Sequence, residues 1–278
     1  MGWRVNPAEQ DRVLFEGVFP DAKRVLEEGK IKLEDFAGLY GDERIARDND
    51  YVRTKKDEVE SRLSPQEREA KREALIFEAL FHEGVNVHGW LGDMARIVKT
   101  SDFDDWKNGV DGIVEFKEPD TAAQHLALAV DMTFSSQLAK KFEKIRDDIL
   151  KGELARIDYF RSGNFRGELT NVPRVIVGID RGHLVDIARE VFIRSDKARL
   201  LRHPIQILQL RQMALELDTF AEYAKRIGRK DIAETLRRDE ATVRKILQTK
   251  SVAEGIRIGD WQDDKVFQAI QKELQAFV

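Results

Sequence analysis

Two aspartates interrupt apolar segments that otherwise have the character of buried strands. Asp111 lies in "NGVDGIVEF" (108–116), and Asp131 lies in "LALAVDMTFS" (126–135). The neighbouring residues are mostly apolar or β-branched, which favours strands. A carboxylate among them costs several kcal/mol unless it is paired, protonated or bound to a cation. Two such carboxylates at one edge of a sheet could together hold a divalent cation such as Mg²⁺.

That arrangement suits phosphodiester hydrolysis. A bound divalent cation polarises the phosphate and lowers the pKa of the attacking water, and a nearby lysine can stabilise the developing charge. A structural role is the alternative, and Asp111, which follows Gly109, could simply cap a turn at the start of its strand. Asp131 is harder to explain in that way, because five of the six residues before it are apolar. We therefore interpret the pair as functional.

The pattern "DDWKNGVD…LALAVDMT", behind one helix and ahead of a lysine-bearing helix, resembles the PD-(D/E)XK, or restriction-endonuclease-like, nuclease superfamily. The resemblance covers roughly residues 71–180. It implies a mixed sheet flanked by helices, with Asp111 as the first metal ligand and Asp131 as the second. The implied cofactor is Mg²⁺ or Mn²⁺, and the implied substrate is DNA.

The same resemblance implies a glutamate from the helix that precedes the strands. Glu83 falls in the apolar arc of that helix, whereas Glu78 falls on its polar side, so Glu83 is the candidate. The alternative is that Glu83, near the helix end, only reaches solvent. Asp104 and Asp105, in the loop before the second strand, could add an outer ligand, although a turn role is also open.

The sequence departs from the superfamily pattern at the lysine. Thr133 stands two positions after Asp131, where the superfamily normally has lysine. Some members carry this lysine on the following helix, which here offers Lys140 and Lys141. At about 100° per residue, Lys141 flanks the apolar face of that helix while Lys140 points nearly opposite, so Lys141 is preferred. If neither lysine reaches the site, the protein is a slow nuclease or only binds.

Several elements must position these residues. Ser64, Pro65 and Glu67 form an N-terminal capping pattern that predicts a helix running to about residue 82 or 83 and ending at Gly84. A second helix is expected to end at Gly152. Strands are expected near Met94–Val98, Val110–Phe116, Leu126–Thr133, Ala155–Phe160 and Arg174–Ile179.

The order of these elements predicts an α/β protein with a restriction-endonuclease-like mixed sheet core flanked by helices. Residues 1–70 form a helical N-terminal region, in which several short helices are expected between residues 7 and 60. Residues 71–180 form the nuclease-like core, and residues 181–278 form a helical C-terminal region.

The segment "RKDIAETLRRDEATVRKILQTK" (229–250) resembles a helix-turn-helix with its turn at Arg238 and Asp239. Thr242, Arg244 and Lys245 would then contact DNA. The alternative is an ordinary amphipathic hairpin with a basic face. Residues 181–250 carry 16 Lys and Arg against 10 Asp and Glu, so either version suits phosphate contacts.

Composition limits the remaining classes. The chain of 278 residues contains no cysteine, which excludes disulfides, thiolate zinc sites and cysteine nucleophiles and fits a reducing compartment. No apolar run approaches the roughly 20 residues of a membrane span, and the first ten residues have no apolar signal segment. The protein is thus expected to be soluble and cytoplasmic without a membrane partner, and a homodimer remains open.

The main prediction is therefore a metal-dependent DNA endonuclease that uses carboxylate-bound Mg²⁺. A second hypothesis is a catalytically inactive nuclease fold that serves as a nucleic-acid-binding or interaction module, and Thr133 favours it. A third is a helix-turn-helix regulator whose α/β core is only a scaffold.

Overall fold

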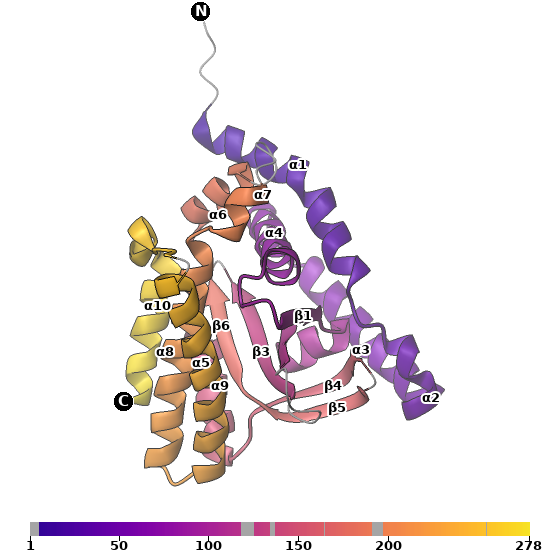
Figure 1. Ribbon diagram of the computed structural model, residues 1–278. Helices are drawn as coiled ribbons and strands as arrows, with labels where there is room; N and C mark the ends of the chain where they lie inside the picture. The colour runs from indigo at the N-terminus through magenta and orange to yellow at the C-terminus, as the bar shows by residue number, and fades with distance from the viewer. Residues whose placement is uncertain (1–5, 118–124, 134–136, 164, 191–196, 254) are drawn as a thin grey trace, which may run out of the picture.

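The computed structural model describes residues 6–117, 125–133, 137–163, 165–190, 197–253 and 255–278. The sequence-predicted segments that reach residues 134–136 lie partly outside this description. A four-stranded mixed sheet occupies the centre of the molecule (Figure 1). Its strands, in spatial order, are β1 (Ala95–Lys99), β2 (Gly112–Lys117), β3 (His125–Thr133) and β6 (Arg174–Gly178).

The first three strands form an antiparallel meander, and β6 pairs in parallel with β3. A parallel neighbour requires a crossover connection, which here contains α5 (Ala139–Lys151) and the hairpin of β4 (Ala155–Ser162) with β5 (Phe165–Val172). The protein is therefore a mixed α/β protein with helical regions at both ends, as predicted.

Helices account for most of the remaining chain. They are α1 (Pro7–Glu28), α2 (Ala37–Tyr40), α3 (Asp42–Glu60), α4 (Pro65–His88), α6 (Arg181–Ala188), α7 (Lys197–Leu201), α8 (Ile205–Arg226), α9 (Lys230–Gln248) and α10 (Lys265–Leu274). In Figure 1, α1 and α4 lie on one side of the sheet, and α5, α8, α9 and α10 stand beside β6.

The N-terminal region differs from the prediction of several short helices. Within it, α1 has 22 residues and α3 has 19 residues, and α1 continues through Pro20. Its apolar residues, among them Phe15, Val18 and Leu26, are buried in the main core, and α1 packs along α4. Apolar clusters that look separate in the sequence therefore form one continuous stripe on a long helix.

Helix α4 begins as predicted but ends later. Ser64 and Glu67 form a complete capping box. The predicted stop at Gly84 is wrong, because the helix continues to His88 and ends at Gly89, whose φ is +60°. Gly84 instead provides space for an indole, since a Cβ there would lie 2.2 Å from the ring of Trp90. Gly84 therefore permits the close packing of Trp90, which follows the helix, against α4.

The outer edge of β6 is covered by side chains of α8. Gln212 makes two hydrogen bonds with the backbone of Gly178, at 3.0 and 2.9 Å, and Glu216 accepts one from the amide of Ile176 at 2.9 Å. These buried polar side chains satisfy backbone groups that an edge strand would leave open. Helix α8 is thus an integral part of the sheet's packing.

Side chains that alternate along the central strands point to opposite faces of the sheet and so belong to two different hydrophobic cores. Ile97, Val114 and Leu128 belong to the larger core, which also contains residues of α1, α4, α5 and α8. Ile113 and Ala129 belong to a smaller core with residues of α3 and β4. The larger core takes residues from all three regions expected from the sequence, so their apolar faces are buried against one another.

Strand β5 was not predicted. Its sequence, "FRGELTNV", lacks the apolar and β-branched segment that marked the other strands, and only Gly167 and Val172 are buried. It pairs only with β4, in a two-stranded sheet. β4 is held against the smaller core by Tyr159, whose hydroxyl donates to Asp48 at 2.6 Å.

The predicted helix-turn-helix is wrong, and so is the alternative of a helical hairpin within residues 229–250. Residues Lys230–Gln248 form one continuous helix, α9, which passes through Arg238 and Asp239 without a turn and packs along α8. Asp239 is almost fully buried, so this position faces the neighbouring helices. Among the described residues, no helix is both long enough and apolar enough to cross a membrane.

Candidate functional site

Asp111 and Asp131 meet at one end of the central sheet. Regular pairing of β2 with β3 ends at Gly112 and Val130. Beyond that point the Asp111 amide donates to the Val130 carbonyl at 3.0 Å, and the Met132 amide donates to Asp111 Oδ2 at 2.6 Å. The side chain of Asp111 thus continues the strand pairing and is fixed beside the strand that carries Asp131.

Lys141 completes this pair from α5. Its Nζ lies 2.5 Å from Asp131 Oδ1, and its side chain is 36% exposed whereas that of Asp131 is 12% exposed. Lys140 is exposed and has no such contact within the described residues. The structure therefore brings together Asp111, Asp131 and Lys141, while Lys140 points elsewhere on the helix.

The local electrostatics disfavour the two negative charges. Burial raises the pKa of Asp111 well above its ordinary value, and the charges of Asp105, Asp131 and Glu78 raise it further. Burial also raises the pKa of Asp131, and the Lys141 ammonium opposes part of that shift. An additional cation near these carboxylates would therefore be stabilised.

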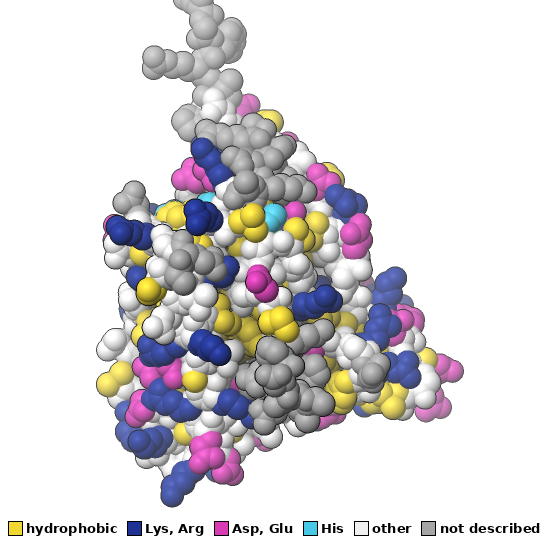
Figure 2. Space-filling model, in the orientation of Figure 1, with side chains coloured by type: hydrophobic (Ala, Val, Ile, Leu, Met, Phe, Trp, Pro, Cys, Tyr) yellow, Lys and Arg dark blue, Asp and Glu magenta, His cyan; other side chains and the backbone are white. Residues whose placement is uncertain are grey.

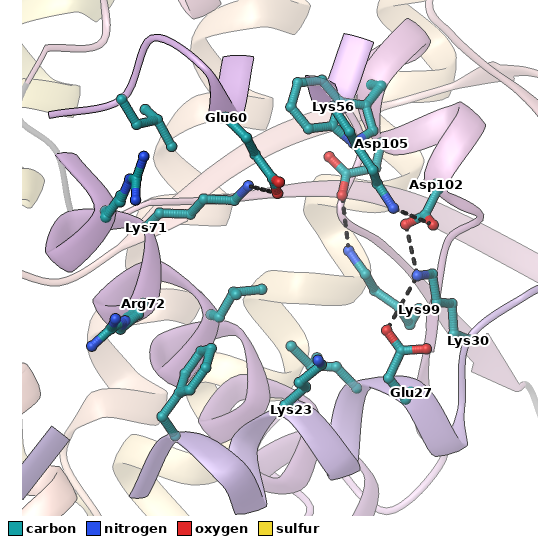
Figure 3. A pocket seen from close by; sticks show the side chains of 16 residues that line it. Lys23, Glu27, Lys30, Lys56, Glu60, Lys71, Arg72, Lys99, Asp102 and Asp105 are labelled. Carbon is teal, nitrogen blue, oxygen red and sulfur yellow. Dashed lines mark hydrogen bonds and ion pairs between the residues drawn. The ribbon is translucent and has the colours of Figure 1, made fainter. Parts of the chain in front are cut away.

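A second charged group lies against the first. Lys99, at the end of β1, has its Nζ 2.6 Å from Glu78 Oε1 on α4. The same Nζ lies 3.3 Å from Asp105 Oδ2 (Figure 3). Burial alone would lower the pKa of Lys99, but the carboxylates of Asp105, Glu78 and Asp111 raise it above its ordinary value. Two lysines and four acids thus form one connected cluster, which we call the acid–lysine cluster: Glu78, Lys99, Asp105, Asp111, Asp131 and Lys141.

The structure places Glu78 in this cluster and not Glu83. Glu83 is half-buried and has no side-chain ion pair or hydrogen bond within the described chain. The helical wheel placed Glu78 on the polar side of α4, but residues 76–82 are buried on every side of the helix, so Glu78 faces the protein interior as well. Lys99 was also missed, although a signal was present: it shares the inward alternation of Ala95 and Ile97.

Asp104 and Asp105, which were expected in a loop, lie in a helical turn (Asp104–Asn108) before β2 and have separate roles. Asp104 is fully buried, and its carboxylate accepts hydrogen bonds from the amides of Asp158 and Tyr159 at 2.7 and 3.1 Å. Burial raises the pKa of Asp104 to about 6. Asp104 thus attaches this helical turn to β4, whereas Asp105 contributes its charge to the acid–lysine cluster.

Thr133 and Arg174 lie close by on neighbouring strands. Thr133 is buried at the end of β3 opposite Gly178, where a Cβ would lie 2.4 Å from the Thr133 carbonyl oxygen. Arg174 begins β6, is 7% exposed and donates to the Asn108 carbonyl at 2.7 Å. Its charge lowers the pKa of Asp131, so it is a further cation near the site that the sequence reading had not selected.

The tail residues expected to contact DNA have different surroundings. The Thr242 hydroxyl donates to the Arg238 carbonyl one turn earlier, and Arg244 pairs with Glu240 and Asp218. Lys245 is exposed. Dark blue side chains gather where α5, α8 and α9 lie in Figure 2, but acidic side chains are interspersed among them. This surface is mixed in charge, and α9 is not a recognition helix of a helix-turn-helix.

A group with the spacing of a three-ligand metal site lies elsewhere. Among the described residues, Asp180, His183 and Asp264 each have a ligand atom within 4.8 Å of the others. Their oxygens are already engaged: Asp180 accepts from the His183 amide, and Asp264 accepts from the amides of Val266 and Phe267. We interpret this group as two joined helix N-caps, with His183 Nδ1 2.9 Å from Asp264 Oδ2.

Comparison of the chain with family models, with curated proteins and with solved structures found no match in any of the three.

Proposed function

We propose that this protein is a divalent-metal-dependent DNA nuclease with a restriction-endonuclease-like core. The observation that supports this most is the junction of Asp111 and Asp131 at one end of the central sheet, with Lys141 Nζ 2.5 Å from Asp131. The order helix, three antiparallel strands, helix and parallel strand is compatible with the proposed fold. Thr133 stands where the superfamily normally has lysine, and Lys141 on the crossover helix would supply that amine instead.

The donor set suits a hard cation such as Mg²⁺ or Mn²⁺. Asp111 and Asp131 would hold it. Asp111 contacts the Met132 amide through Oδ2, and Asp131 contacts Lys141 through Oδ1, so the other oxygen of each carboxylate is outside these contacts. Two protein carboxylates are an ordinary complement for Mg²⁺, which keeps several waters and binds substrate phosphate oxygens. When bound, the ion supplies Lewis-acid polarisation of the phosphate and a lower pKa for its water.

The remaining roles belong to side chains of this chain. Lys141 holds Asp131 in one orientation, and its ammonium can stabilise negative charge that develops on the phosphate. Asp105 and Glu78 hold Lys99, and that amine adds positive charge beside the acids. The cluster could thus position a phosphodiester group and stabilise the negative charge of its pentacoordinate transition state.

A cleavage assay tests this proposal. Purified protein with Mg²⁺ or Mn²⁺ should cut labelled DNA, and EDTA should stop the reaction. Asp131→Asn should lower the rate by at least about 100-fold, because it removes a metal ligand while keeping the shape of the side chain. Asp147→Asn, on the exposed face of the same crossover helix, is the matched control and should cut at the wild-type rate. Full activity of Asp131→Asn would refute the proposed site.

One observation favours the second hypothesis, a nucleic-acid-binding module without catalysis. The ammonium groups of Lys99 and Lys141 already neutralise part of the acidic charge, so the acid–lysine cluster does not require a bound ion to be stable. Calorimetric titration with Mn²⁺ distinguishes the two functions. Absence of both Mn²⁺ binding and cleavage, with retained nucleic-acid binding, would support the module.

A further inference from the structure

A cavity of about 900 Å³ opens between the N-terminal helices and the end of β1. Figure 3 shows its lining side chains, which come from α1, α3, α4 and the segment from Lys99 to Trp106. Among the described residues, seven Lys or Arg and four Asp or Glu line it. This excess of positive charge differs from the chain as a whole, whose formal net charge is −4.

The cations of this cavity are only partly neutralised. Lys30 and Lys56 share Asp102, at 2.7 and 2.8 Å. By contrast, Lys23 and Arg72 are exposed and have no carboxylate within 4.0 Å in the described part of the chain. Their charges are therefore available to an anionic ligand.

Aromatic rings stand among these cations. The Lys71 amine lies 5.8 Å from the ring centre of Trp106, and the Arg72 guanidinium lies 5.9 Å from that of Phe19. Both rings line the cavity and are half-buried, so each has an accessible part. Proteins bind single-stranded nucleic acids with cationic side chains that contact the phosphate backbone and with aromatic rings on which the bases stack.

The cavity is continuous with the acid–lysine cluster. Lys99 and Asp105 line it and at the same time belong to that cluster (Figure 3). A strand bound along the cavity would consequently lie against Lys99 and Asp105, the two members of the cluster that face the cavity.

We propose that this cavity binds the backbone of a single-stranded nucleic acid and leads it to the acid–lysine cluster. The role as substrate path rests on the proposed nuclease function, whereas binding itself does not. A volume of about 900 Å³ resembles that of small-molecule pockets, so it accepts a few nucleotides of one strand and excludes the body of a duplex. The N-terminal helices are thus a substrate-binding element.

Fluorescence anisotropy tests the inference without catalysis. A labelled 12-nucleotide single-stranded DNA is titrated with protein in EDTA at several salt concentrations. Lys23→Glu combined with Arg72→Glu should weaken binding by at least tenfold. It should also reduce the salt slope by about 1.4, since each lost single-strand phosphate contact contributes about 0.7. Arg211→Glu combined with Lys272→Glu reverses two exposed charges outside the cavity and should leave affinity within about twofold.

Trp106→Leu provides a second, independent test. It keeps an apolar side chain for packing but removes the ring, so affinity should fall several-fold with an unchanged salt slope. Circular dichroism must show wild-type helix content for each variant. Competition with unlabelled strands then identifies the ligand: single-stranded DNA should compete at least tenfold better than duplex of the same sequence. Single-stranded RNA that competes equally would show that the cavity recognises features common to both.

The outcomes separate this inference from the proposed nuclease function. The proposed binding role of the cavity would be overturned if wild type and the Lys23/Arg72 double variant had equal affinity, or if duplex competed more strongly than single strands. This holds even if the wild type cleaves DNA. If the wild type binds single strands but cleaves nothing, and the double variant binds them more weakly, the nuclease proposal fails and the binding inference stands. Lack of any single-strand binding by the wild type would overturn the inference outright.

Discussion

At the scale of single residues, Lys141 and Lys140 offer a comparison between neighbours of the same type. Lys141 contacts Asp131 at 2.5 Å, whereas Lys140 is exposed. Lys141→Ala should lower turnover by about 100-fold or more with little change in DNA affinity, because its ammonium acts mainly on charge in the transition state. Single-turnover kinetics and anisotropy measure the two quantities. Lys140→Ala is the control, and an equal loss in both variants would contradict the assignment.

The raised pKa of Asp111 makes a separate prediction about stability. A carboxyl whose pKa is raised by folding adds stability below its ordinary pKa, and this is lost as pH rises through the folded value. Asp111→Asn, which can still accept the hydrogen bond from Met132, should therefore melt higher than wild type at pH 8. We expect about 1 kcal/mol, or roughly 2–4 °C.

Scanning calorimetry without divalent ions should show this difference narrowing towards pH 4, where the wild-type carboxyl is protonated. Addition of Mg²⁺ or Mn²⁺ at pH 8 should raise only the wild-type melting temperature, because the variant has lost a ligand. A variant that is less stable than wild type at pH 8 would mean that the charged form of Asp111 is needed for folding.

At the scale of elements, Asp180 caps α6 and Asp264 caps α10, and His183 joins the two caps. The hydrogen bond to Asp264 raises the pKa of His183, although burial opposes this. Stability from this link is then complete below about pH 6.5 and is lost as pH rises through the higher folded pKa. His183→Asn, which keeps a donor near Nδ1, should thus be more destabilising at pH 6 than at pH 9.

Thermal melts of both proteins at the two pH values measure this effect. His203 is the matched control, since burial lowers its pKa to about 4 and its contribution has the opposite sign. His203→Asn should therefore lose less stability at pH 6 than at pH 9. A pH-independent loss in His183→Asn would show that charge on this histidine is unimportant.

At the scale of the whole molecule, the C-terminal region is required by the sheet. Gln212 and Glu216 satisfy the backbone of β6, and Leu208 and Met213 are fully buried in the larger core. A fragment ending at residue 180 should therefore lack a cooperative melt and expose apolar surface, which circular dichroism and dye binding would detect. A cooperative transition in that fragment would show that residues 1–180 fold without the C-terminal region.

The sequence by itself determined the main elements and the principal acids. Short apolar and β-branched segments located β1, β2, β3 and β6, and Ser64 with Glu67 located the start of α4, because these signals arise between residues close in the chain. Helical spacing also selected Lys141 over Lys140, since Lys141 flanks the apolar face that packs in the core.

Tertiary structure alone decided which other charges join the site. Glu78 and Lys99 belong to different elements, and only the packing of α4 on β1 brings their charges to 2.6 Å. The length of α4 was decided in the same way, because Gly84 accommodates Trp90 and so does not end the helix. The continuity of α9 likewise follows from packing along α8, which buries Asp239 where a turn was expected. Local periodicity can show that Lys99 points inward, but it does not show which residues of other elements it meets, so the fold had to be known before these contacts could be found.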